Sequence, residues 1–321
     1  MWGREDEYYQ NSGKANPRPC YKVDANNPGS DLAGETSAAL AATSMAFKGS
    51  DSVYAATLLQ HAKELYTFAK TNQGAYSSSI PDAQNFYNSF SGYMDELAWS
   101  AAWLHKATGE QQYLTDAEQF FNSMQQNPGE FSWDNKGRGV AALLSQLTGK
   151  TGYKQNVDSF CNQMQNNQAR TNYGTVFIQQ WGSNRHAANV AFVCLAHSKA
   201  TGQFNDFGRE QINNLLGDEA ADKPSFVVGY GFNPPTQPHH RSSSCPNRPA
   251  PCGWTEFNIN APNPHVLNGA LVGGPRSTTD TYVDDRRDYI ENEITLDYNA
   301  GFQSALAALL ELQKEGDCGQ N

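Results

Sequence analysis

A recurring helical hairpin, in which a glycine separates two helical patterns, most constrains the fold of this chain. Glycine stands at positions 49, 109, 149 and 202, so the hairpins recur at spacings of 60, 40 and 53 residues. Glycine takes the left-handed conformation that ends a helix more readily than any other residue. Apolar residues repeat with helical spacing in eight segments, which are residues 31–47, 51–70, 95–108, 111–124, 136–148, 153–166, 185–201 and 205–216.

The spacing of these hairpins predicts an all-α protein. No segment competes with them as a strand, and the spacing is too irregular for a solenoid, so we expect an irregular ring of helical hairpins. If the glycine turns lie at one end of the ring, the longer connections lie at the other, where function is usually carried. Those connections are residues 71–94, 125–135, 167–184 and 217–296.

Composition excludes several classes of protein. The chain has 321 residues, of which 38% are hydrophobic and 17% charged, and its net charge is −10 without a basic cluster. Nucleic acid is therefore not expected as a partner. No apolar stretch is long enough to cross a membrane, and the N-terminus lacks the layout of a secretion signal.

The six cysteines carry a second, weaker signal about the compartment. Cys245 and Cys252 bracket a short loop and could close a disulfide, which requires an oxidising compartment. Cys161 and Cys194 fall inside helical patterns, and we expect them to be buried thiols. No Cys-x2-Cys pair supports a zinc site.

The strongest candidate for a functional site is the stretch YVDDRRDYIENEITLDYNA, residues 282–300. It holds six of the chain's 33 acidic residues, together with tyrosines at positions 282, 289 and 298. Its first part is predicted to be a loop, and a helix is predicted from about Asp297, so Glu293 lies just before a helix N-terminus that favours negative charge. A solvated acidic loop would explain the charge equally well. The regular tyrosines favour a polar, ring-shaped ligand.

A second candidate is the stretch SFVVGYGFNPPTQPHHR, residues 225–241, whose prolines and glycines fix an irregular backbone. It places His239 and His240 beside Arg241, where they could donate hydrogen bonds to sugar hydroxyls or keep a carboxylate ionised. A structural loop with solvated basic tips is the alternative. A metal site is disfavoured, because adjacent histidines rarely converge on one ion and no third ligand is suitably spaced.

Two further stretches contain candidate ligand-binding residues. Asp95 and Glu96, with Ser91 nearby, offer the oxygen ligands that calcium requires, although their spacing alone favours an ordinary helix N-terminus. Trp181 precedes a helix and could present its flat face to a sugar ring or lie in the core. Other residues in helical patterns are predicted to be structural: Trp99 and Trp103 in packing, and His61, His105 and His197 at the helix surface.

The acidic stretch resembles the C-terminal active-site pattern of glycoside hydrolase family 9, in the form Tyr282-x-Asp284-x4-Tyr289-x3-Glu293-x-Thr295-x3-Asn299-Ala300. The resemblance extends over the whole chain and implies one domain, residues 1–321, of an N-terminally truncated, animal-type member. It implies an (α/α)6 barrel of helical hairpins and an inverting endo-β-1,4-glucanase, or cellulase. Glu293 would be the general acid, and Asp284 belongs to the same active-site pattern.

The resemblance also implies roles in the other stretches. His239 and Arg241 would bind glucose units beside the cleavage point, and we count His239 with the catalytic residues. Aromatic residues would line the sugar cleft, namely Tyr87, Phe90, Trp181 and Tyr298, although some members have Trp where this chain has Phe90. Family members often hold a structural calcium, and the matching ligands here are Ser91, Gly92, Asp95, Glu96 and Asp134.

The family's catalytic base lies in an Asp-Ala-Gly-Asp motif, which does not occur in this sequence. We therefore expect about three N-terminal helices of the barrel to be missing and the chain alone to be inactive. A relative that only binds β-glucan is the alternative. We further expect a secreted monomer that acts on β-1,4-glucan and uses no redox or nucleotide cofactor.

Overall fold

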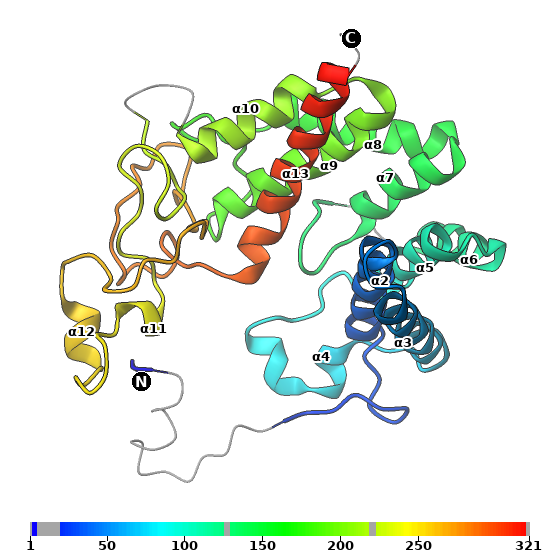
Figure 1. The fold of residues 1–321 in the computed structure, drawn as a ribbon, viewed down its shortest axis with the longest axis horizontal. Coiled ribbons are helices and arrows are strands. Elements are labelled where there is room, and N and C mark those ends of the chain that lie inside the picture. The colour runs from blue at the N-terminus through cyan, green and yellow to red at the C-terminus, as the bar shows by residue number, and fades with distance from the viewer. Residues whose placement is uncertain (1, 5–19, 125–128, 218–222, 319–321) are drawn as a thin grey trace. The chain divides into compact units, whose positions relative to one another are not determined.

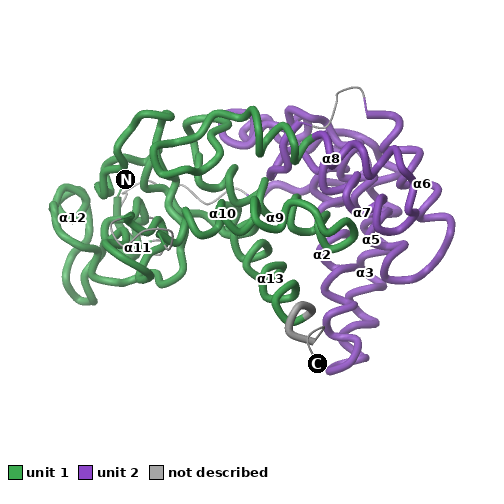
Figure 2. The backbone as a smooth tube through the Cα atoms, turned by 90° about the horizontal axis from the view of Figure 1, so that it is seen from above, with its two compact units in different colours: residues 1–18, 160–321 green, residues 19–159 purple. Residues whose placement is uncertain are grey.

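The computed structural model describes residues 2–4, 20–124, 129–217 and 223–318 (Figure 1). The chain divides into two compact units (Figure 2). Unit 1 comprises residues 1–18 and 160–321, and unit 2 comprises residues 19–159. Trp2 belongs to unit 1, where its indole N–H donates to Ser244 Oγ at 2.8 Å.

The predicted hairpins form where the apolar periodicity places them. Unit 2 contains α2 (Ser30–Phe47), α3 (Ser52–Thr71), α4 (Tyr76–Ser79), the 3-10 helix η1 (Pro81–Asn85), α5 (Met94–Thr108), α6 (Gln111–Ser123) and α7 (Gly137–Thr148). Helix α8 (Thr151–Asn166) runs from unit 2 into unit 1. Unit 1 then contains α9 (Ser183–Thr201), α10 (Asn205–Leu216), α11 (Arg241–Ser244), α12 (Trp254–Asn258) and α13 (Leu296–Cys318). Residue pairing of the β type is confined, in the described parts of the chain, to isolated bridges.

Three of the four glycine turns end their helices as predicted. Gly109, Gly149 and Gly202 have φ angles of 76°, 66° and 70°, in the left-handed region that glycine adopts without strain. The prediction for Gly49 is wrong. Helix α2 ends instead at Lys48 in the right-handed conformation, because the Phe47 carbonyl accepts from both Ser50 N and Asp51 N, which closes the turn without a left-handed residue.

Small side chains form the core of unit 2 and let its helices approach closely. Helix α2 packs against both α3 and α5. A Cβ atom on Gly34 of α2 would lie only 2.9 Å from the Glu96 carbonyl oxygen of α5, so a larger residue is excluded there. Trp99 and Trp103 pack edge to face with ring centroids 5.5 Å apart, as their shared helix face predicted.

Helix α9 is the central helix of unit 1 and packs against α10 and α13. The prediction that His197 lies at a helix surface is wrong, because its side chain is fully buried. The prediction assumed that only the apolar face of the helix is covered. Because α9 is covered by both α10 and α13, polar residues outside its apolar face are buried as well. His61 is exposed as predicted, and His105 is half-buried.

Two disulfides tie unit 1 together. Cys245 and Cys252 are bonded as predicted. Cys161 and Cys194 are buried as predicted, but the prediction that they are thiols is wrong. They form a disulfide between α8 and α9, because packing brings their Cα atoms to 5.8 Å. The helices of the described residues are all too short or too polar to cross a membrane.

Candidate active site

Glu293 lies at the centre of the candidate site in unit 1, just before α13 as predicted. One of its carboxylate oxygens, Oε2, accepts two hydrogen bonds: Trp181 Nε1 donates at 2.8 Å and the Tyr298 hydroxyl at 2.9 Å. The Glu293 side chain is half-buried, and Trp181 is 43% exposed, so the group is open to a ligand from one side. The structure therefore brings Trp181 to a carboxylate that lies 112 positions away in the sequence.

Local backbone geometry fixes the two donors. Tyr298 is buried in the first turn of α13, and Trp181 stands directly before Gly182, the N-cap of α9. Gly182 has a φ of 67°, and a Cβ atom there would lie 2.9 Å from the Tyr298 ring. Glycine is therefore required at this position both for the left-handed backbone and for the approach of the tyrosine.

Arg185 supports both donors and was not predicted as a site residue. Its buried guanidinium lies over the Tyr298 ring at 5.2 Å from the ring centroid, donates to Asp297 Oδ2 at 2.8 Å and reaches the Trp181 carbonyl at 3.4 Å. Burial raises the pKa of Tyr298, and the neighbouring Glu293 raises it further, so the hydroxyl stays protonated and remains a donor. The sequence signal was the spacing Trp-x3-Arg at the start of a helix.

His239 adjoins Glu293, to which its backbone pairs in an isolated parallel bridge. Its Nδ1 lies 2.6 Å from the Arg286 carbonyl oxygen. Because a carbonyl can only accept, Nδ1 carries the proton, and in the neutral ring Nε2 is left as an acceptor. Arg241 begins α11 two residues later and is half-buried.

Aromatic rings frame this group, and Tyr289 completes the frame although we did not assign it a role from the sequence. Tyr289 is 52% exposed, its ring centroid lies 5.5 Å from that of Trp181, and the His239 ring is 6.1 Å away. The Tyr-x3-Glu spacing within the acidic stretch was the available signal.

Asp284 anchors the neighbouring loop. One carboxylate oxygen accepts from Thr236 N at 2.8 Å and from the Thr236 hydroxyl at 2.6 Å, and the other accepts from Gln237 N at 2.9 Å. Asp285 pairs with Arg287, with Nη2 2.6 Å from Oδ2. The predicted catalytic role of Asp284 stays a prediction, and its carboxylate is already engaged by the loop that carries His239.

The other predicted site residues belong to unit 2. The Tyr87 and Phe90 rings both contact Trp133 edge to face, at centroid distances of 5.1 and 6.4 Å. Both side chains are largely exposed, as expected for sugar-binding aromatics. Trp133 joins them to form a three-ring surface, so it is an additional candidate for stacking.

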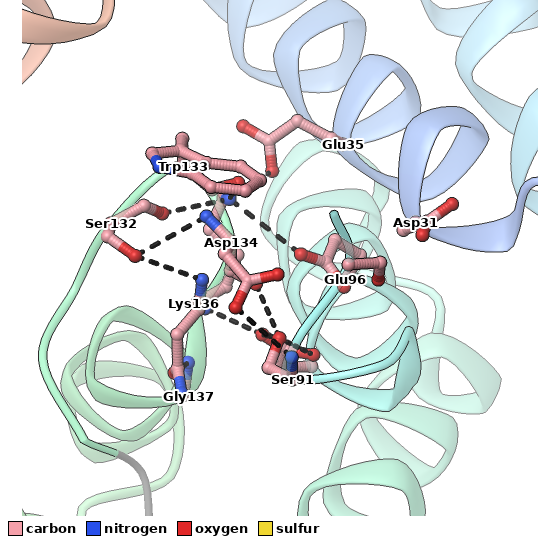
Figure 3. Close-up of polar contacts among 12 residues, drawn as sticks. Asp31, Glu35, Ser91, Glu96, Ser132, Trp133, Asp134, Lys136 and Gly137 are labelled. Atoms are coloured by element: carbon pink, nitrogen blue, oxygen red, sulfur yellow. Dashed lines mark hydrogen bonds and ion pairs between the residues drawn. The ribbon is translucent and has the colours of Figure 1, made fainter. Parts of the chain in front are cut away.

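The predicted calcium ligands Ser91, Asp95 and Asp134 converge within unit 2. Figure 3 shows Ser91 beside Asp134. Ser91 Oγ lies 2.5 Å from the Asp134 carbonyl oxygen and 3.4 and 3.5 Å from the two Asp95 carboxylate oxygens. The Asp134 carboxylate is taken by the backbone N–H groups of Phe90 and Ser91, so Asp134 offers its main-chain oxygen to a cation. A pocket of about 390 Å³ adjoins Ser91, Gly92 and Asp95.

A buried lysine, which we did not predict, lies beside this group (Figure 3). Lys136 Nζ donates to the Ser132 and Trp133 carbonyls and lies 3.5 Å from Glu35 and 3.7 Å from Glu96. Burial alone would lower the pKa of Lys136, but the neighbouring carboxylates outweigh it and raise the pKa. Glu96 thus faces Lys136, and its own pKa is raised well above the usual value, chiefly by burial.

These donors suit a hard cation. Hydroxyl, carboxylate and carbonyl oxygens are the ligands that calcium prefers. In the described part of the chain no three His, Cys, Asp or Glu side chains are arranged to hold a metal, so a site here depends on the Ser91 hydroxyl and the Asp134 carbonyl.

Helical hairpins that carry a half-buried carboxyl group among exposed aromatic rings define the class as an all-α protein whose candidate site combines an acid with aromatic side chains. Comparison with known proteins narrows this class. Residues 1–306 match Glycosyl hydrolase family 9. The chain therefore belongs to glycosyl hydrolase family 9.

Relatives and solved structures agree with this assignment. Endoglucanase B of Cellulomonas fimi is 45% identical over 314 residues, which cover 92% of this chain and 29% of that protein. The solved endoglucanase of the termite Nasutitermes takasagoensis has a TM-score of 0.89 and 50% identity, covering 97% of this chain and 71% of that one. Cel9M of C. cellulolyticum, solved with cellobiose, has a TM-score of 0.83 and 36% identity, covering 97% and 70% of the two chains.

This likeness confirms the predicted fold class, the (α/α)6 barrel of helical hairpins. The chain spans between 29% and 47% of the length of the first three curated relatives. That about three helices of the barrel are missing stays a prediction.

Proposed function

We propose that this chain is the catalytic part of an endo-β-1,4-glucanase that hydrolyses internal bonds of cellulose or a related β-glucan with inversion. The observation that carries the proposal is the pair of hydrogen bonds from Trp181 and Tyr298 to one oxygen of Glu293, beside exposed aromatic rings. The matched relatives are named endoglucanases, and Cel9M was solved with cellobiose.

The two hydrogen bonds assign different tasks to the two oxygens of Glu293. Oε2 accepts from both donors, so in the acid form the proton resides on Oε1. Oε1 is therefore the atom that would protonate the oxygen of the glycosidic bond as it breaks. Trp181 and Tyr298 then stabilise the carboxylate that remains.

His239 and the rings would hold the sugar for this step. The free Nε2 of His239 can accept a hydrogen bond from a sugar hydroxyl, because Nδ1 is fixed as the donor to Arg286. The exposed faces of Trp181 and Tyr289 suit the apolar face of a glucose ring.

An inverting hydrolase also needs a second carboxyl group, about 6.5–9.5 Å from the acid, to activate water. We assign this base to neither Asp284 nor Asp285, because Asp284 is engaged by the loop at 236–237 and Asp285 by Arg287. The engagement of both carboxylates favours binding of β-glucan without hydrolysis as the second candidate function.

We also propose a structural calcium held by Ser91 Oγ, the Asp95 carboxylate and the Asp134 carbonyl. Bound calcium would supply positive charge between two loops of unit 2 and would thereby fix the three-ring surface of Tyr87, Phe90 and Trp133. Glu96 stays a weaker candidate, since it faces Lys136. The Gly92 carbonyl accepts from the Ser89 hydroxyl, as the Asp134 carbonyl does from Ser91, and stays a further candidate.

The protein is proposed to act outside the cell as a monomer. Two disulfides suit an oxidising compartment such as the outside of the cell, where the proposed polysaccharide substrate would also lie.

Affinity electrophoresis tests the proposed function independently of turnover. We expect a gel that contains carboxymethyl β-1,4-glucan to retard the chain, and a starch gel of equal viscosity to leave its mobility unchanged. Trp181→Ala should reduce the retardation. Equal mobility in both gels would contradict any β-glucan function of this chain.

A further inference from the structure

A continuous series of ring contacts leads away from the candidate acid through unit 1. Successive ring centroids lie 5.5, 6.1, 6.3 and 5.3 Å apart, in the order Trp181, Tyr289, His239, Phe257 and Trp254. Trp181 donates to Glu293, so the series begins at the candidate acid and ends at α12.

Trp254, at the far end, is exposed although it is the largest apolar side chain of its segment. It is the first residue of α12 and leaves 56% of its surface accessible, while its edge packs against Phe257 at 88°. Phe257 is held in turn by the buried Trp2, at a centroid distance of 4.6 Å. One edge of the Trp254 indole is therefore packed against Phe257, and the rest of the ring is exposed to solvent.

The segment that carries Trp254 is fixed at its N-terminal end. The Cys245–Cys252 disulfide closes the chain just before it, and the Glu256 carboxylate accepts from Gly253 N at 2.6 Å at its N-cap. The position of the exposed ring is thus set before any ligand arrives, which lowers the entropic cost of binding.

Arg286 connects the segment that carries Trp254 to the acidic stretch, residues 282–300. Its guanidinium is buried and donates to the carbonyls of Glu256, at 2.8 Å, and Ala261, while its own carbonyl accepts from His239 Nδ1. One residue of the acidic loop therefore fixes both His239 and the support of Trp254.

We propose that Trp254 is a distal sugar-stacking platform that binds a β-glucan chain beyond the cleavage site, on the side of His239. The inference rests on the proposed β-glucan function and adds a subsite to it. An exposed, rigidly held indole offers a flat face to the apolar face of a pyranose ring. Three rings lie between Trp254 and Trp181 in the series, so the proposed subsite requires a ligand longer than one that stacks on Trp181 alone.

Binding of oligosaccharides of two lengths tests this platform without requiring hydrolysis. Calorimetry of the 321-residue chain should give tighter binding of cellohexaose than of cellobiose. Trp254→Ala should weaken cellohexaose binding about 3- to 10-fold and leave cellobiose binding unchanged. Trp254→Phe should retain most of the affinity, because it keeps a flat ring.

Phe232→Ala is the matched control, since Phe232 is also 56% exposed but is not part of the ring series. The Trp254 indole N–H signal in the NMR spectrum, assigned by its loss in Trp254→Phe, should shift with cellohexaose and not with cellobiose. Equal cellohexaose affinity in wild type and Trp254→Ala, or an equal loss in Phe232→Ala, would overturn the platform while leaving the proposed function intact. Failure of the wild-type chain to bind either oligosaccharide would overturn both.

Discussion

Both hydrogen bonds that Glu293 accepts depend on one buried guanidinium. Arg185 lies over the Tyr298 ring and contacts the Trp181 carbonyl, and its own position is fixed by Asp297. A carboxyl group that acts as an acid must be held where the leaving oxygen will be. At the residue scale, the candidate site is therefore a carboxylate held by two donors that share a support.

Replacing the acid should separate binding from hydrolysis. In Glu293→Gln the amide oxygen can still accept from Trp181 and Tyr298, but no proton is available for the leaving oxygen. We expect any reducing-sugar release to fall by about 10²-fold or more, with unchanged retardation in the β-glucan gel. Asp285→Asn is the control, and comparable turnover in both variants would remove Glu293 from the role of acid.

Asp284 and Asp285 are adjacent carboxylates with different expected contributions to stability. Asp284→Ala leaves Thr236 N, the Thr236 hydroxyl and Gln237 N without their acceptor, which should cost about 1–3 kcal/mol in the free energy of unfolding. Asp285→Ala breaks an ion pair with the exposed Arg287, so it should change the free energy of unfolding little. Urea denaturation measures both, and equal effects would mean that Asp284 is no anchor.

At the scale of elements, two kinds of cross-link hold the helices and loops. In unit 1 the Cys161–Cys194 bond joins α8 to α9, and in unit 2 hydrogen bonds to the Asp134 carboxylate join the loop at Phe90 and Ser91 to the loop at Trp133. The first cross-link restricts the unfolded chain, and the second brings the Ser91 hydroxyl, the Asp95 carboxylate and the Asp134 carbonyl together as oxygen ligands of the kind that calcium prefers.

The two disulfides should differ in their effect on stability. Cys161 and Cys194 are separated by 33 positions and Cys245 and Cys252 by 7. By loop-closure entropy, replacing both cysteines with alanine should cost about 4 kcal/mol for the first pair and about 2.5 kcal/mol for the second. Denaturant midpoints of the two double variants test this order, and the reverse order would contradict it.

Calcium should stabilise the native state. Adding calcium to a chelator-treated sample should raise the melting temperature, because a ligand that binds only the folded chain favours it by mass action. Asp95→Asn should abolish the increase, while Asp82→Asn, at the exposed η1 segment, should keep it. An unchanged melting temperature in the wild type would leave the oxygen cluster without a metal role.

At the scale of the whole molecule, the predicted site residues are divided between the two units. Unit 1 holds the candidate acid with its donors, and unit 2 holds the oxygen cluster with its three-ring surface. Within unit 1, Asp284 accepts hydrogen bonds from the loop at 236–237 and Asp285 pairs with Arg287. The Asp-Ala-Gly-Asp motif that carries the family's catalytic base does not occur in the sequence.

Hydrolysis by the chain alone should therefore be weak. Loss of a general base typically lowers a rate by about 10²–10⁴-fold, so we expect reducing-sugar release at least 10²-fold slower than by Endoglucanase B of Cellulomonas fimi. Comparable rates would place a base within these 321 residues.

The sequence by itself determined the helices and the position of the candidate acid. Helical periodicity depends on neighbours three and four residues away, so α9 and α10 were predicted to within two residues of their observed bounds. Glu293 was predicted before a helix start for the same reason, and Gly109, Gly149 and Gly202 end helices through their own backbone freedom.

Tertiary structure alone decided which side chains meet. The donors of Glu293 include Trp181, 112 positions away, and Asp297 reaches Arg185 over the same separation. Local patterns carry no information about such distances. The Cys161–Cys194 bond, the buried Lys136 and the loop that engages Asp284 all arise from packing between elements, and packing also buries His197, which its own helix would have left in solvent.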